Sequence, residues 1–415
     1  MELFQYIGGA LSCEAVPLAS LADLYGTPLY VYSESSIRQR YLALDQAYAS
    51  IPHLICYALK ANDNIAIARV LAALGAGVDV VSGGEAYKAR LAGFPASQTI
   101  FAGVGKSRAE ITDAIDQDIL AFNVESPAEL NRIGEVAAEK RKIARISVRV
   151  NPDVDPKTHP YISTGLRKAK FGVPAEMVVA LYRQARDHEF IEPVGIQMHI
   201  GSQLLHLQPI VDGVERLARL VGELSSEGIK LSYFDIGGGI GIQYADQAAE
   251  GPSDLAPRVI PIVRELGLKL LCEPGRYLVG QSGALVTEVL YRKENGPKTF
   301  VIVDAAMNDL IRPSLYDAFH AIEPIQQAST TDTEVVDVVG PICESGDFFA
   351  HDRSLAPVQA GDRLAILSAG AYGFAMASNY NARPRAAEVL VCGAEHRLVR
   401  QRETYDDLVR TEEGL

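Results

Sequence analysis

The apolar positions of this chain gather in short, nearly continuous runs over its first two thirds. Each run ends in polar or glycine residues and is followed by a segment with the amphipathic spacing of a helix. The runs cover residues 55–59, 77–81, 99–102, 120–124, 146–150, 194–200, 231–236 and 268–272. Because hydrophobicity is mostly continuous within each run rather than alternating, the pattern predicts parallel strands that are buried on both faces.

Eight predicted strands alternating with eight helical segments most simply close into a (β/α)8 TIM barrel. We assign residues 28–279 to this barrel, and its class is α/β. The alternative is an open, doubly wound sheet, which the same alternation also permits.

The pattern changes after residue 279. Strand-like runs at 285–291, 299–304, 334–339 and 363–367 are separated by glycine, proline and aspartate turns, without the helical segments seen before. Residues 280–415, together with 1–27, therefore predict a second, mainly β domain. Within the N-terminal part, residues 18–25 have the aliphatic pattern of a helix.

Composition narrows the function. With 415 residues, 48% of them hydrophobic, the chain can bury a large core. Its formal net charge of −13 argues against nucleic acid or an anionic membrane surface as partner, and favours a small metabolite. The five cysteines have no CxxC spacing, so neither a disulfide framework nor a metal site is indicated. We expect a reducing, cytoplasmic setting, without export or membrane insertion.

Lys60 is the candidate reactive centre. It ends the first apolar run, where partial loss of solvation would lower the pKa of its amine and allow a Schiff base with an aldehyde or ketone. A lysine that simply extends to water from a strand end is the plain alternative. The barrel hypothesis favours the reactive interpretation, because active sites of such barrels lie where the strands end.

Polar groups do follow the other predicted strands. They include Asp79, His199, Ser202, the glycine cluster 237–241, Glu273 and Arg276. The glycine cluster lacks the GxGxxG spacing of a dinucleotide site, but loops after the seventh and eighth strands of barrels commonly bind phosphate. An amine and a phosphate cradle at one barrel mouth imply an aldehyde bearing a phosphate, which describes pyridoxal 5′-phosphate.

Three residues fit that cofactor further. A carboxylate such as Glu273 beside the pyridine nitrogen would keep the ring an effective electron sink. His199 would stack on the ring face and Ser202 would hydrogen-bond the phosphate. A packing role for His199 is the alternative to that assignment.

Seven ordered motifs then resemble the decarboxylases of the alanine racemase-like, fold type III family of pyridoxal phosphate enzymes, from about residue 30 to 390. These motifs are YALKAN (57–62), HIGSQ (199–203), GGGIG (237–241), EPGR (273–276), NDLIRPSLYDA (308–318), CESGD (343–347) and AGAYG (369–373).

The resemblance implies residue roles. Lys60 would carry the cofactor and Cys343 would protonate the substrate α-carbon, so these two are the catalytic candidates. The cofactor-binding set comprises Lys60, Asp79, His199, Ser202, Gly238, Gly239, Glu273, Gly275, Arg276 and Tyr372. The substrate-binding set comprises Arg276, Arg312, Tyr316, Glu344 and Tyr372. Cys343 and Glu344 would act on the cofactor of the other subunit, which implies an obligate homodimer with shared active sites.

The implied activity is decarboxylation of meso-2,6-diaminopimelate to L-lysine and carbon dioxide, the last step of lysine biosynthesis. A related decarboxylase acting on ornithine, arginine, lysine or carboxynorspermidine is the alternative, and a pyridoxal phosphate-binding regulator without catalysis is a third. The arginines favour diaminopimelate, because its second amino-acid head needs a guanidinium and ornithine would leave Arg312 without a partner. A racemase is disfavoured because Glu273 makes the electron sink stronger.

Overall fold

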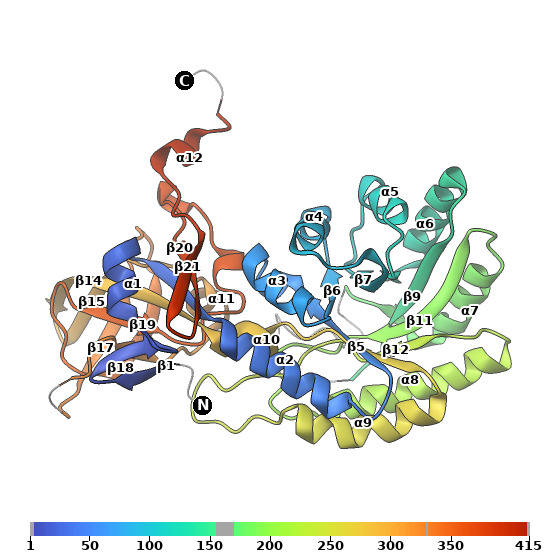
Figure 1. Ribbon diagram of the computed structural model, residues 1–415, viewed down its shortest axis with the longest axis horizontal. Helices are drawn as coiled ribbons and strands as arrows, with labels where there is room; N and C mark the ends of the chain where they lie inside the picture. Colours follow the sequence, from blue (N-terminus) through green and yellow to red (C-terminus); the bar gives the residue numbers. More distant parts are fainter. Residues whose placement is uncertain (1–3, 155–169, 329–330, 413–415) are drawn as a thin grey trace. The chain divides into compact units, whose positions relative to one another are not determined.

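The protein folds into two compact units, which are drawn in the computed structural model of Figure 1. The structure describes residues 4–154, 170–328 and 331–412. The barrel unit consists of residues 40–243 and 248–277, and the β unit consists of residues up to 39, 244–247 and those from 278 onward. No helix in the described residues is long and apolar enough to cross a membrane.

The barrel unit contains the predicted closed ring of eight parallel strands. They are β5 (His53–Ala58), β6 (Gly77–Val80), β7 (Thr99–Phe101), β8 (Ala121–Val124), β9 (Ala144–Asn151), β11 (Ile191–Met198), β12 (Tyr233–Asp235) and β13 (Lys269–Cys272). Neighbours in sequence pair in parallel around the ring, and β13 pairs with β5 to close it. A two-residue strand, β10 (Val173–Pro174), is added beside β9. The TIM-barrel prediction is confirmed and the open sheet is excluded.

Helices alternate with these strands, as the amphipathic segments predicted. They are α2 (Glu34–Tyr48), α3 (Ile65–Ala73), α4 (Gly83–Ala92), α5 (Arg108–Asp116), α6 (Pro127–Lys140), α7 (Ala175–Arg186), α8 (Gln208–Ser226) and α9 (Pro252–Leu266). Helices α4, α5 and α6 begin at side-chain caps. The hydroxyl groups of Ser82, Ser107 and Ser126 accept a hydrogen bond from the N–H group of the third residue of these helices. A short α10 (Arg276–Val279) follows β13.

The β unit contains two sheets. The small one runs β1 (Phe4–Ile7), β2 (Ala10–Cys13) and β3 (Val16–Pro17). The large one has the order β18 (Phe348–Leu355), β17 (Glu334–Val339), β15 (Lys298–Val303), β14 (Gly283–Asn295), β4 (Leu29–Ser33), β20 (Ala387–Cys392) and β21 (Glu395–Arg400). Strand β19 (Arg363–Ile366) pairs with β14 and with β16 (Ile322–Pro324). The helices are α1 (Leu18–Tyr25), α11 (Arg312–Tyr316) and α12 (Tyr405–Val409).

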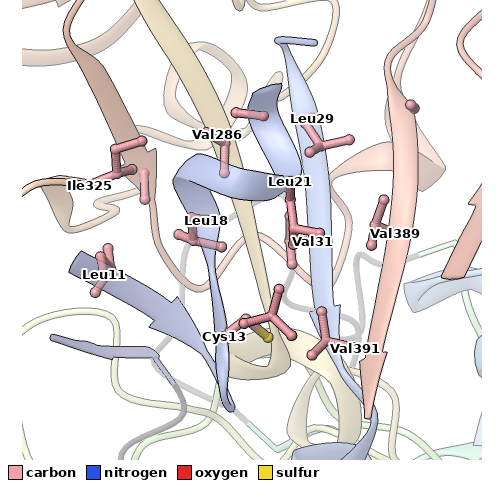
Figure 2. Packing of buried hydrophobic residues seen from close by; sticks show 14 residues of the cluster. Leu11, Cys13, Leu18, Leu21, Leu29, Val31, Val286, Ile325, Val389 and Val391 are labelled. Atoms are coloured by element: carbon pink, nitrogen blue, oxygen red, sulfur yellow. The ribbon is translucent and has the colours of Figure 1, made fainter. Parts of the chain in front are cut away.

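One hydrophobic core joins distant segments of the β unit (Figure 2). Leucine side chains of α1 pack against side chains of β2, β4, β14 and β20. Val31, Val286 and Val389 come from three adjacent strands of the large sheet and are fully buried. Burying each such side chain stabilises the fold by about 1.5–3 kcal/mol. The mainly β domain expected from the sequence is therefore a packed unit of its own.

The structure places the first boundary later than residue 28. Strand β4 pairs antiparallel with β14 and parallel with β20, so residues 29–33 belong to the β unit. An apolar run followed by a helix has the same pattern whichever sheet receives the strand. Its alternate residues Leu29 and Val31 complete the core of the β unit, and this packing decides where the strand lies.

Candidate active site

Lys60 lies just beyond the end of β5, in the one-turn 3-10 helix Leu59–Ala61. Its Nζ is 2.6 Å from Oδ2 of Asp79, which is completely buried on the adjacent strand β6. The lysine side chain is about one third exposed, so its amine is reachable from the barrel mouth. The backbone of β5 and β6 thus brings together an amine and a carboxylate that the sequence separates by 19 residues.

Glu273 follows β13 directly and is buried. Asn123 Nδ2, from β8, donates to its Oε1 at 3.0 Å, and Gln197 Nε2, from β11, donates to its Oε2 at 3.1 Å. Two amides from different strands therefore fix the plane of this carboxyl group. A side chain held in this way cannot turn out to solvent without breaking two buried hydrogen bonds.

Asp235, at the end of β12, is a second buried acid beside Glu273. Burial raises the pKa of Glu273 well above its usual range, and the negative charges of Asp235 and Asp79 raise it further. Burial also raises the pKa of Asp235, to about 7. Two adjacent carboxyl groups in a buried site resist simultaneous ionisation unless a cation is placed among them.

The glycine cluster forms a tight turn after β12. Asp235 Oδ1 accepts from Gly237 N at 2.8 Å, and Glu273 N donates to Gly237 O at 2.8 Å. A Cβ atom at Gly238 would lie 2.3 Å from the Glu273 carbonyl oxygen, and one at Gly239, where φ is +106°, would lie 2.6 Å from the carbonyl oxygen of Gly201. Only glycine lets the backbone pass here, and backbone N–H groups in such turns bind phosphate well.

His199 and Ser202 follow β11 and adjoin the same turn. Gly238 N donates to His199 Nδ1 at 3.2 Å, so this nitrogen carries no proton. Burial, followed by the positive charges of Arg149 and Lys60, lowers the pKa of His199 well below its usual range. Arg276 Nη2 donates to Ser202 Oγ at 3.2 Å. The neutral imidazole is suited to stacking on an aromatic ring without adding a positive charge, and the Ser202 hydroxyl is suited to a phosphate.

The residues at the barrel mouth fit pyridoxal phosphate. The buried Glu273 carboxyl group is held by two amides and has a raised pKa. A protonated ring nitrogen beside it would stabilise its ionised form. The glycine turn has no room for a side chain, so only backbone lines the mouth there, and Lys60 supplies the amine. Gly275 is equally confined, because a Cβ atom there would lie 2.9 Å from Cβ of Ala61.

The β unit holds the remaining predicted residues. Cys343 and Glu344 lie in the loop between β17 and β18, and both are exposed. Tyr380 Oη donates to Glu344 Oε2 at 2.7 Å. Asp347 anchors this loop, since its carboxylate accepts from the N–H groups of Met307 and Ile342, each at 2.7 Å.

Arg312 and Tyr316 are the first and last residues of α11. Arg312 is buried, and Tyr316 is partly exposed. The α11 residue Ser314 donates to the carbonyl oxygen of Gly346, which joins the helix to the loop of Cys343. Tyr372 adopts a left-handed backbone conformation with φ of +56°, which is uncommon for a residue other than glycine and is found preferentially at functional sites. The β unit therefore gathers the loop and helix that carry these residues, while their roles stay predictions.

Several polar residues near these sites carry little signal in the sequence. Gln197 and Asp235 lie within predicted apolar strands, and His320 and Tyr244, which contact Arg312, lie outside all seven motifs. A lone polar residue inside an otherwise apolar strand was the available signal for the first two. No comparable signal marked His320 or Tyr244.

The barrel and the residues at its mouth define the class of pyridoxal-dependent enzymes. A family model described as "Pyridoxal-dependent decarboxylase, pyridoxal binding domain" matches residues 34–280, more than half of the chain. The diaminopimelate decarboxylase of Aquifex aeolicus is 50% identical over 98% of this chain and 96% of that protein. The diaminopimelate decarboxylase of Vibrio cholerae is 47% identical over the full length of both.

Solved structures agree. The diaminopimelate decarboxylase of Helicobacter pylori, in complex with L-lysine, has a TM-score of 0.92 and 45% identity, covering 95% of this chain and 99% of that one. The enzyme of M. jannaschii, also with L-lysine, has a TM-score of 0.95 and 39% identity, covering 100% and 98%. The chain belongs to the diaminopimelate decarboxylase family.

Proposed function

We propose that this protein decarboxylates meso-2,6-diaminopimelate to L-lysine and carbon dioxide, with pyridoxal 5′-phosphate as cofactor. The observation that carries the proposal is the buried Glu273 carboxyl group, oriented by two amides in the same barrel mouth as Lys60. Similarity over the whole chain to diaminopimelate decarboxylases supports the choice of substrate.

The cofactor, when bound, supplies a ring that accepts the electron pair left on the substrate α-carbon as carbon dioxide departs. Lys60 offers its Nζ as the covalent attachment point, and Asp79 keeps that amine aimed into the site through the contact of 2.6 Å. The Glu273 carboxyl group, held by Asn123 and Gln197, would pair with the pyridine nitrogen. The glycine turn that contains Gly238 and Gly239, together with Gly275 and Arg276, would hold the phosphate.

The β unit supplies recognition of the far end of the substrate. Arg312, with Arg276 and Tyr316, binds the distal carboxylate, because guanidinium groups match carboxylates in a planar, two-point contact. Glu344 accepts hydrogen bonds from the distal ammonium group, and Tyr372 contributes to both cofactor and substrate contacts. A substrate such as ornithine, whose distal end carries only an amine, has no carboxylate for this buried guanidinium to bind.

Cys343 donates the proton that replaces carbon dioxide on the α-carbon. Its Sγ is exposed in this chain, which is an unusual setting for a group that must protonate a carbanion shielded from water. This exposure supports a homodimer in which Cys343 and Glu344 act at the cofactor of the partner subunit. The five cysteines are all free, which supports a reducing, cytoplasmic location.

The test is a substrate panel. Purified protein loaded with pyridoxal phosphate is incubated separately with meso-diaminopimelate, L-ornithine, L-arginine and L-lysine, and carbon dioxide release and the amine product are measured. We expect meso-diaminopimelate to be preferred and L-lysine to be its product. Preference for another amino acid would overturn the substrate assignment, and no release from any of them would overturn the decarboxylase itself.

A further inference from the structure

His320 is a completely buried histidine that directly contacts the guanidinium of Arg312. It lies four residues beyond the end of α11 and is 0% exposed, while Arg312 is 5% exposed. Arg312 Nη1 lies 2.8 Å from His320 Nε2, and His320 Nδ1 lies 2.8 Å from the carbonyl oxygen of Leu367. The ring therefore bridges the guanidinium and the backbone at the end of β19.

The chemistry of the two contacts fixes the state of this ring. A carbonyl oxygen only accepts hydrogen bonds, so His320 Nδ1 carries the proton that is donated to Leu367 O. A guanidinium only donates, so Nε2 accepts from Arg312 Nη1. Both contacts are satisfied by the neutral imidazole protonated at Nδ1, whereas an imidazolium would place one N–H group against another.

The backbone that holds His320 is itself fixed. Leu367 N donates to the carbonyl oxygen of Ala321 at 2.8 Å, directly after His320 in the chain. Ile322 and Ile366 then pair in the β16–β19 ladder. His320 thus lies directly before a paired strand, and its backbone position is fixed. Its acceptor nitrogen therefore has a defined direction.

Tyr244 contacts the same guanidinium with its ring. The Cζ atom of Arg312 lies 4.5 Å from the centroid of the Tyr244 ring, a cation–π distance. The same ring meets His320 edge-on, with centroids 5.3 Å apart and planes at 75°. Tyr244 and His320 together restrain Arg312 through two different kinds of contact, a ring and a hydrogen-bond acceptor.

We propose that His320 and Tyr244 are positioning residues that set the orientation of the Arg312 guanidinium for the distal carboxylate of the substrate. This inference rests on the proposed function, in which Arg312 binds that carboxylate. A two-point contact between guanidinium and carboxylate requires the two planes to be aligned, so a correctly oriented guanidinium binds more tightly than a freely turning one. Neither residue needs to touch the substrate.

The test compares two ligands that differ only in this carboxylate. L-lysine carries the distal amino-acid head that remains after decarboxylation, and 1,5-diaminopentane is the same chain without the carboxylate. Their Kd values are measured for the cofactor-loaded protein and for His320→Leu, which fills the space but offers no acceptor. We expect the Kd for L-lysine and the KM for diaminopimelate to rise about tenfold, the loss of one charge-assisted hydrogen bond. The Kd for 1,5-diaminopentane, kcat and the visible absorption of bound cofactor should stay near wild type.

His320→Gln is the rescue variant, because its amide offers one acceptor and one donor at a spacing similar to that of the two ring nitrogens. It should recover most of the affinity for L-lysine. Tyr244→Phe, which keeps the ring, should resemble wild type, and Tyr244→Leu should weaken L-lysine but not the diamine. If His320→Leu does not fold, the comparison of Tyr244→Phe with Tyr244→Leu tests the positioning role by itself.

If the variants lose affinity for L-lysine and 1,5-diaminopentane equally, or lose affinity for neither, the positioning role is overturned. That outcome is separate from failure of the proposed function. If the wild-type protein releases no carbon dioxide from diaminopimelate, the function itself is wrong, whatever the variants do.

Discussion

The barrel unit and the β unit hold their candidate functional residues in opposite ways. In the barrel unit the acids Asp79 and Glu273 are buried. Asp79 accepts a hydrogen bond from Lys60, and Glu273 accepts hydrogen bonds from Asn123 and Gln197. In the β unit the proposed proton donor lies on an exposed loop, and so does the proposed acceptor for the distal ammonium. The difference agrees with the proposal that the barrel unit supplies most of the cofactor contacts, while the loop of the β unit acts at a site shared with a second subunit.

Lys60→Ala tests the barrel half and should have the largest effect. Without Nζ the cofactor has no covalent attachment point, so turnover should fall to background and the visible absorption of bound cofactor should be lost. Lys142→Ala is a matched control, because Lys142 lies on the surface in an ion pair with Asp116. Appreciable decarboxylation by Lys60→Ala would mean that another lysine is the anchor.

Cys343→Ala tests the β half. It should keep the visible absorption of bound cofactor but lose about 10²- to 10⁴-fold in kcat, the usual contribution of a positioned acid. Cys392→Ala removes the other exposed thiol and should leave kcat unchanged. A normal kcat in Cys343→Ala would show that Cys343 is not the proton donor.

Arg312→Lys sharpens the role of the β unit in recognition. The positive charge remains, but an ammonium cannot make the planar two-point contact with a carboxylate. We expect kcat/KM for diaminopimelate to fall about 10- to 100-fold, mostly through KM, in steady-state measurements. An unchanged kcat/KM would show that Arg312 does not bind the substrate.

The smallest expected effect concerns the pH dependence of stability in the barrel unit. Burial, then Asp235 and Asp79, raises the pKa of Glu273 above its value in the unfolded chain, which is about 4.3. The folded protein therefore binds this proton more tightly, and the free energy of unfolding decreases as pH rises above that value. Glu273→Gln removes this loss.

Thermal unfolding of the cofactor-free proteins checks this expectation. The Tm of wild type relative to Glu273→Gln should decrease between pH 5 and pH 8. Parallel dependence of the two Tm values on pH would contradict the assignment of a buried, proton-binding carboxyl group to Glu273.

The sequence was most informative where local pattern and tertiary structure agree. All eight barrel strands and the strand-like runs at 285–291, 299–304, 334–339 and 363–367 are strands in the structure. Lys60, Glu273 and the glycine turn follow strand ends, which parallel strands in a barrel bring to one mouth.

Pattern alone could not show which partner each segment would choose. Strand β4 looks like the start of a barrel unit but pairs with β14 and β20. The contact between His320 and Arg312 depends on the path of the chain between β16 and β19, which no short-range spacing records. Residues that meet a proposed site residue from a distant segment were therefore harder to predict than residues at strand ends.

Mixing two inactive variants tests most directly whether the two units serve one active site from different subunits. Lys60→Ala and Cys343→Ala proteins carrying different tags are allowed to exchange subunits, and heterodimers are isolated and assayed with meso-diaminopimelate. If sites are shared, one site of each heterodimer holds both defects and the other holds native Lys60 and Cys343, so about half of the wild-type activity per dimer should return. Heterodimers confirmed by both tags, yet no more active than either parent, would contradict the shared site.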